Sequence, residues 1–113
     1  MAHLATVNSD GTPQVSPVWV DTDGEAILMN TARGRIKHRN LEARPWAAVS
    51  LVDAAAPYDR TLIARGPVTL IEDGALEHID LLSRKYDRTP WNARPGEVRV
   101  IIRLLPDRIA PAN

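Results

Sequence analysis

The sequence of 113 residues contains no cysteine. This absence excludes disulfides, thiolate-held iron–sulfur clusters and cysteine nucleophiles together, and it fits a reducing cytosol. Lysine and arginine together number 14, as do aspartate and glutamate, so the formal net charge at pH 7 is zero. A chain without net charge has no overall field that favours nucleic acid or an anionic membrane, so any anion site must be local.

Other signals are absent too. No apolar run approaches the roughly 18 residues that a membrane-spanning helix needs, and the N-terminus has no signal-peptide pattern, so we expect a cytoplasmic protein that does not enter a membrane. The three histidines, His3, His38 and His78, are far apart and unpaired, which argues against a metal site. The sequence also lacks a nucleophile elbow and the glycine patterns of dinucleotide and Walker phosphate loops.

Short β-rich runs separated by Asp-Gly turns fill the first part of the chain. These runs are residues 2–8, 13–21 and 26–30. Tight acidic turns between β-rich runs predict an antiparallel meander. Pro17 lies in the middle of the second run, where a proline requires an edge strand or a bulge.

The second part combines strands with one amphipathic helix. Residues 46–53, 60–71 and 98–105 read as strands, and the last places Arg99 and Arg103 on one face. Gly66-Pro67 predicts a bend within its strand. Ala75, Ile79, Leu82 and Tyr86 recur at helical spacing, which predicts a helix over 73–86 with Asp73 as its N-cap.

The remaining segments are expected to be irregular, namely the loops 54–59 and 87–97 and the C-terminal residues 106–113. The sum is about six strands and two helices in one domain spanning residues 1–113. Because the turns are too short for crossover connections, the sequence predicts an antiparallel β-barrel rather than a doubly wound sheet.

A basic segment from Met29 to Pro45 follows the third strand. Five of the 14 lysines and arginines fall between Arg33 and Arg44, and Pro45 should end the helix that they form. Asn30 and Thr31 are suitable N-caps for this helix. A strand leading into a short basic helix gathers N–H groups, the positive end of the helix dipole and cations, which favours a phosphate. The alternative is a solvated basic surface.

Few side chains suggest acid–base chemistry, and none is predicted to act as a catalytic acid or base. Tyr58, Tyr86 and His38 are candidates only in the sense that they can donate a proton. The tryptophans Trp19, Trp46 and Trp91 are individually more typical of core or rim packing than of cofactor platforms.

Three motifs carry a family resemblance. Leu4 to Val20 resembles the opening of the pyridoxamine 5′-phosphate oxidase-like superfamily, the flavin-binding split barrels, and is nearest to the branch of oxidoreductases dependent on the deazaflavin coenzyme F420. Asn30-Thr31 followed by Gly34 to Leu41 matches a second hallmark. Arg65-Gly66 before Val68 matches a third, in a strand that the family also bends. The match covers nearly the whole chain in order.

The resemblance implies a mainly β fold, an antiparallel split β-barrel with two helices, and a flavin-type cofactor. The cofactor phosphate would be held by Gly34, Arg35 and Lys37. The ring edge would lie along Pro17, Val18 and Trp19 and at Asn30-Thr31. Arg33, Arg35 and Arg39 beside Lys37 are expected to give the acidic tail of F420 a cationic exit route.

The implied activity is hydride transfer between F420 and an unsaturated small organic molecule. An FMN-dependent pyridoxamine 5′-phosphate oxidase-like oxidase and a non-catalytic flavin- or haem-binding protein are the alternatives, because the phosphate anchor is shared. The resemblance also implies a homodimer with the cofactor site at the subunit interface. A small barrel with spare apolar surface makes physical sense of that assembly.

Overall fold

The computed structural model describes residues 1–56 and 60–112. Within these ranges the chain forms eight strands and two helices, the latter α1 (Ile36–Ala43) and α2 (Ala75–Tyr86). The strands are β1 (Ala2–Val7), β2 (Pro13–Val18), β3 (Asp21–Thr22), β4 (Ile27–Ala32), β5 (Trp46–Val52), β6 (Thr61–Ile71), β7 (Arg99–Leu104) and β8 (Arg108–Pro111). The mainly β split-barrel prediction with two helices is confirmed.

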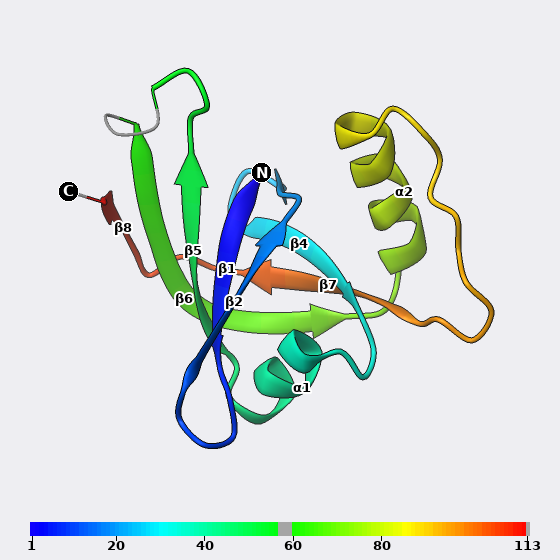
Figure 1. Ribbon diagram of the computed structural model, residues 1–113, viewed down its shortest axis with the longest axis horizontal. Helices are drawn as coiled ribbons and strands as arrows, with labels where there is room; N and C mark the ends of the chain where they lie inside the picture. Colours follow the sequence, from blue (N-terminus) through cyan, green and yellow to red (C-terminus); the bar gives the residue numbers. More distant parts are fainter. Residues whose placement is uncertain (57–59, 113) are drawn as a thin grey trace.

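The strands form one curled antiparallel sheet in the order β2-β1-β5-β6-β7-β4-β3, with β8 added beside β6 (Figure 1). β6 makes the curl possible because it takes part in two ladders. Residues 61–67 of β6 pair with β5, and residues 68–71 pair with β7. The predicted bend at Gly66-Pro67 is therefore confirmed, and it is visible where β6 turns sharply in Figure 1.

Gly66 has to be glycine for a steric reason. A Cβ atom at this position would collide with the carbonyl oxygen of Leu105, which follows β7. The N–H of Leu105 donates to the carbonyl oxygen of Pro67, and the N–H of Asp107 donates to that of Arg65. These bonds fasten the chain after β7 across the corner of β6.

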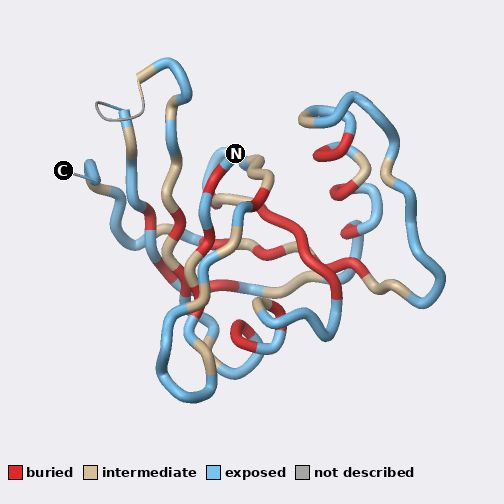
Figure 2. The backbone as a smooth tube through the Cα atoms, in the orientation of Figure 1, coloured by how far each residue is buried: buried red, intermediate tan, exposed pale blue. Residues whose placement is uncertain are grey.

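The core lies on the concave side of the sheet, where buried positions from most strands meet (Figure 2). The buried apolar residues there are Ala2, Leu4, Val18, Met29, Leu41, Ala47, Val49, Ala64, Val68, Ile102 and Leu104. Leu41 is the member from α1. Burying a leucine side chain stabilises a fold by about 1.5–3 kcal/mol, so Leu41 holds α1 against the barrel.

Two N-cap predictions are wrong. Asn30 and Thr31 belong to β4, because its ladder with β7 continues to Ala32 and the N–H of Arg33 still donates to the carbonyl of Val98, the residue before β7. The helix begins at Ile36 after Arg35, and no side chain caps it. Likewise Gly74, in the left-handed region at φ 75°, precedes α2 in place of Asp73.

The C-terminal prediction was also wrong in part. Residues 106–113 were expected to be irregular, whereas β8 pairs with the first half of β6. A four-residue strand that ends in Pro111 carries little strand signal of its own, and the free edge of β6 supplies the pairing. Pro17 does lie on an edge strand as predicted, opposite His3 in regular register. The predicted loop 54–59 is described only as far as residue 56.

α2 covers the outer side of β4 and β7, and the predicted apolar stripe is confirmed at Ala75, Ile79 and Leu82, all buried. A polar contact joins the helix to the strand beneath it. The side-chain amide of Asn30 on β4 donates both to the carbonyl of Ala75 and to Nδ1 of His78, at 3.0 Å each. Because Nδ1 accepts, the proton of the neutral ring is on Nε2, which has no hydrogen-bond partner among the described residues.

The burial of His78 makes the stability of the fold depend on pH. Burial lowers the pKa of His78 below its ordinary 6.5, with a smaller opposing contribution from Asp21. The unfolded chain then binds a proton at a pH where the folded chain does not. The stability contributed by keeping His78 neutral is therefore fully present above about pH 6.5. It is lost as the pH falls through that value toward the lowered pKa.

We predict that His78→Asn removes this part of the pH dependence, because the Asn amide oxygen replaces Nδ1 as acceptor and does not titrate. Urea unfolding at pH 7.5 and pH 5.5 gives the decrease in unfolding free energy between the two pH values for each protein. The decrease in the parent minus the decrease in the variant is the contribution of His78. One proton contributes at most about 1.4 kcal/mol per pH unit. Equal losses in both proteins would contradict the assignment.

Candidate functional site

Two hollows in the surface meet at Lys37. One, of about 210 Å³, is called here the aromatic hollow and is lined by Met1, Pro17, Val18, Trp19, Asn30, Lys37, Ile79, Trp91 and Arg99. The other, of about 430 Å³, is called the basic hollow and is lined by Gln14, Gly34, Arg35, Ile36, Lys37 and Arg39. The structure thus gathers seven of the nine predicted site residues around one lysine.

A larger hollow of about 520 Å³ lies between α1 and the turn joining β1 and β2. It is lined by Asn8, Ser9, Asp10, Ile36, Arg39, Asn40, Ala43 and Arg44. Of these, only Arg39 was expected to meet the cofactor, through the acidic tail of F420. Volume alone therefore does not identify the site, and the convergence of polar and aromatic groups is the better guide.

The start of α1 is built by the sharp turn after β4. Gly34 has φ 89°, in the left-handed region that glycine adopts without strain, and it turns the chain from strand to helix. Its N–H donates to Nδ1 of His38 at 3.1 Å. The first-turn N–H groups, those of Ile36, Lys37 and His38, are left without a capping side chain. They form the helix end that suits an anion.

Lys37 stands between the two hollows and is half-buried. Its Nζ donates to Oγ of Ser16 on β2, at 3.0 Å. Burial lowers the pKa of Lys37, and repulsion from Arg35 and Arg99 lowers it further. The three cations are therefore close enough to repel one another, although the whole chain is neutral.

Two of the predicted site residues lie outside both hollows. Arg33 is exposed and forms a fork on Glu72, with Nε to Oε2 at 3.0 Å and Nη2 to Oε1 at 2.6 Å. Thr31 alternates with Asn30 along β4, so its side chain points into the core, where Oγ1 has no hydrogen-bond partner in the described part of the chain.

Aromatic rings form one wall of the aromatic hollow. Trp19 stacks on Tyr86 with ring centroids 5.6 Å apart and meets Trp91 edge-on at 6.5 Å. The Tyr86 hydroxyl donates to the carbonyl of Val20 at 3.1 Å. Two of the three proton-donor candidates are therefore engaged, since His38 is buried against Gly34, and Tyr58 lies outside the described residues.

Arg99 and Ile79 line the aromatic hollow although neither was a predicted site residue, and Trp91, expected to serve in packing, lines it too. Arg99 is buried, and its guanidinium lies 4.7 Å from the centre of the Trp91 ring. Burial lowers the pKa of Arg99, which Glu97 opposes, and the group stays charged. An arginine in an otherwise apolar strand was the available signal, because a buried cation needs partners.

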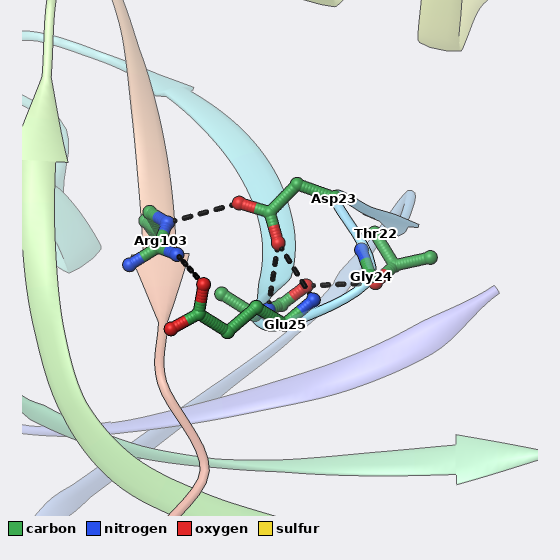
Figure 3. A network of polar contacts seen from close by, with 6 residues as sticks. Thr22, Asp23, Gly24, Glu25 and Arg103 are labelled. Carbon is green, nitrogen blue, oxygen red and sulfur yellow. Dashed lines mark hydrogen bonds and ion pairs between the residues drawn. The ribbon is translucent and has the colours of Figure 1, made fainter.

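The other arginine of β7, Arg103, has a different role (Figure 3). Its Nε donates to Asp23 at 3.0 Å, and its Nη2 lies 3.7 Å from Glu25. Asp23 also accepts from the N–H groups of Glu25 and Ala26, and these backbone bonds, more than Arg103, lower its pKa to about 2. Arg103 thus secures the turn between β3 and β4.

The described residues contain no group of three or more His, Cys, Asp or Glu side chains placed to hold a metal ion. In the same part of the chain, neither helix is long and apolar enough to cross a membrane.

Comparison with known proteins identifies the family. A model described as "Pyridoxamine 5′-phosphate oxidase" matches residues 1–109. A solved structure named "F420 Reductase" is 37% identical, with a TM-score of 0.85 over 97% of this chain and 88% of that one. No curated protein matches the chain.

More distant structures show the shared fold. A pyridoxamine 5′-phosphate oxidase-related, FMN-binding protein from Nostoc punctiforme is 15% identical, with a TM-score of 0.72 over 96% of this chain and 71% of its own. General Stress Protein 26 from Bacillus anthracis is 24% identical, with the same TM-score over 96% and 80%. The chain therefore belongs to the pyridoxamine 5′-phosphate oxidase family of flavin-type oxidoreductases.

Proposed function

We propose that the protein is a reductase that uses the deazaflavin coenzyme F420 and transfers hydride between it and an unsaturated small organic molecule. The observation that supports this proposal most strongly is the pair of hollows that meet at Lys37, one aromatic and one basic. A cofactor with a planar ring at one end and a phosphate with an acidic tail at the other matches this division. The 37% identity to a protein named F420 reductase supports the proposal.

The basic hollow has the donors that a phosphate requires. The N–H groups of Ile36, Lys37 and His38 are uncapped, and Lys37 and Arg35 add positive charge beside them. Burial lowers the pKa of Lys37, repulsion from Arg35 and Arg99 lowers it further, and a bound anion would relieve that repulsion. The residues therefore fit a phosphate.

The acidic tail of F420 would leave along the basic hollow. Arg39 lines it together with Arg35, and among the described residues neither side chain has an acidic partner at ion-pair distance. Arg33, expected to share this route, is occupied by Glu72. FMN ends at a single phosphate and would leave the Arg39 cation unmatched, which favours the deazaflavin.

The ring would lie in the aromatic hollow, beside the end of β2 at Pro17, Val18 and Trp19. Its volume in one chain is about 210 Å³, below the roughly 300–1,000 Å³ of ordinary ligand pockets. We therefore propose that a second copy of the chain completes the site in a homodimer.

The convex side of the sheet is suited to that second copy. His3, Ala5, Val15, Ala48, Ser50 and Ile63 share one face of β1, β2, β5 and β6, named here the outer face, around an apolar depression of about 210 Å³. Val15 is 60% exposed there. Pro17 lies on the same face and also lines the aromatic hollow. A partner covering the outer face would thus border the ring.

When bound, the cofactor ring supplies the hydride chemistry. The chain's own residues bind the phosphate, orient the ring and limit the access of water. No side chain is assigned as acid or base, since Tyr86 and His38 are held by backbone groups.

Parallel titrations with F420 and with FMN test the proposal. We expect tighter binding of F420, because Arg35 and Arg39 meet its acidic tail, and oxidation of reduced F420 by an unsaturated probe such as cyclohexenone. Binding is read from fluorescence and turnover from the absorbance of the cofactor. Comparable or tighter FMN binding with oxygen-consuming activity would instead identify an oxidase. Tight binding without turnover would identify a carrier.

Lys37→Ala is expected to weaken F420 binding by about 1.5–3 kcal/mol, the range for a hydrogen bond to a charged group, while the fold remains intact. Affinity should also fall as salt concentration rises. Lys85→Ala is the matched control, since Lys85 lies on α2 and lines neither hollow. Unchanged affinity in Lys37→Ala would refute the phosphate assignment.

The dimer predicts a mass of about twice the 12.5 kDa chain in light scattering at micromolar concentration. Val15→Glu should shift the protein to monomer and weaken F420 binding, because it buries a charge on the outer face. Thr69→Glu, at an exposed β6 position beyond the bend and in the ladder with β7 rather than β5, should leave the dimer intact. A monomeric parent that binds F420 fully would contradict the interface model.

A further inference from the structure

Arg99 is an unusually enclosed cation. Its side chain is 6% exposed, yet it lines the aromatic hollow. Arginine is rarely buried unless it is paired, so the arrangement around it calls for an explanation beyond packing.

The contacts of Arg99 occupy only part of its guanidinium. Nε donates to Oδ1 of Asn30 at 2.9 Å, and Nη1 lies 3.4 Å from Oε1 of Glu97. The flat side of the group covers the ring of Trp91. Within residues 1–56 and 60–112, Nη2 has no hydrogen-bond partner. Nε, Nη1 and one flat side of the guanidinium are thus engaged, while the N–H groups of Nη2 remain available to a ligand in the aromatic hollow.

Asn30 is itself locked in orientation. Its amide nitrogen uses both hydrogens, one on the carbonyl of Ala75 and one on Nδ1 of His78. Rotating the amide would set its nitrogen against the Arg99 donor and its oxygen against the acceptors of α2. His78 thereby fixes Asn30, and Asn30 fixes Arg99.

We infer that Arg99 binds the cofactor ring, with Nη2 donating to a carbonyl or anionic oxygen on the edge of a planar conjugated ring in the aromatic hollow, and that Asn30 and His78 are positioning residues. The inference rests on the proposed function. The pyrimidine edge of flavins and deazaflavins carries such oxygens, and negative charge gathers there when the ring is reduced, so a nearby cation tunes the cofactor.

The geometry favours the ring over the phosphate as the partner of Arg99. Lys37 and Arg35 stand at the helix start, whereas Arg99 lies among Trp19, Trp91 and Ile79 in the part of the site lined by aromatic and apolar side chains. The competing explanation is structural, namely that the Arg99–Glu97 ion pair only fastens β7 to the loop that precedes it.

A probe that has the ring but no phosphate separates these explanations. The deazariboflavin fragment of F420 lacks both the phosphate and the acidic tail. Arg99→Lys keeps the charge but loses the planar fork, and it should weaken binding of both F420 and the fragment about tenfold or more. Lys37→Ala should weaken only F420. Arg103→Lys, on the same strand and face but paired with Asp23, should weaken neither.

The positioning role is tested by rescue. His78→Leu removes the acceptor for Asn30 and should weaken fragment binding severalfold, whereas His78→Asn restores an acceptor and should restore affinity. Circular dichroism checks the fold of each variant. If Arg99→Lys does not fold, the comparison of His78→Leu with His78→Asn tests the inference. Equal affinities of these two variants for the fragment would overturn it.

The outcomes separate the inference from the proposed function. If the parent binds F420 and the folded Arg99→Lys variant binds the fragment as tightly as the parent does, only the inference is overturned. Arg99 would then contact a substrate or serve a structural role. A parent that binds neither F420 nor FMN would overturn both.

Discussion

The backbone of Gly66 lies so close to the carbonyl oxygen of Leu105 that no side chain fits between them. This contact is the corner at which β6 leaves its ladder with β5 and enters its ladder with β7. Because one strand serves both halves, the sheet must curl. The curl brings the end of β2, the start of α1 and the face of β7 around a common point, which is occupied by Lys37.

Local charge is the second constraint. The chain is neutral as a whole, yet Lys37, Arg35 and Arg99 are close enough to repel one another. Two other arginines form ion pairs outside the two hollows: Arg33 with Glu72, and Arg103 with Asp23 and Glu25. Among the described residues, Arg35 and Lys37 have no acidic partner at ion-pair distance, and they mark where an anionic ligand is accommodated most favourably.

The sequence predicted those features that depend on local chemistry. Backbone preferences predicted the Asp-Gly turns, the Gly66-Pro67 bend and the edge position of Pro17. Helical periodicity predicted the apolar stripe of α2. The failures have a common cause in tertiary pairing. β4 runs past the expected cap residues because β7 lies beside it, and β8 forms because β6 has a free edge.

The candidate site shows the same division. Gly34 and Lys37 were accessible from a motif, whereas Arg99 required knowing that β7 lies beside β4 and beneath α2. The pairing of Arg33 with Glu72 could not be predicted, because the two residues are neighbours in space but distant in sequence.

The central claim is that one ligand spans the two hollows across Lys37, and a nuclear magnetic resonance titration with F420 tests it most directly. The account predicts shifts of the amide resonances of Ile36, Lys37 and His38 together with the indole resonances of Trp19 and Trp91. Trp46 begins β5 outside both hollows and is the internal reference. Shifts at only one hollow, or at neither, would contradict the account.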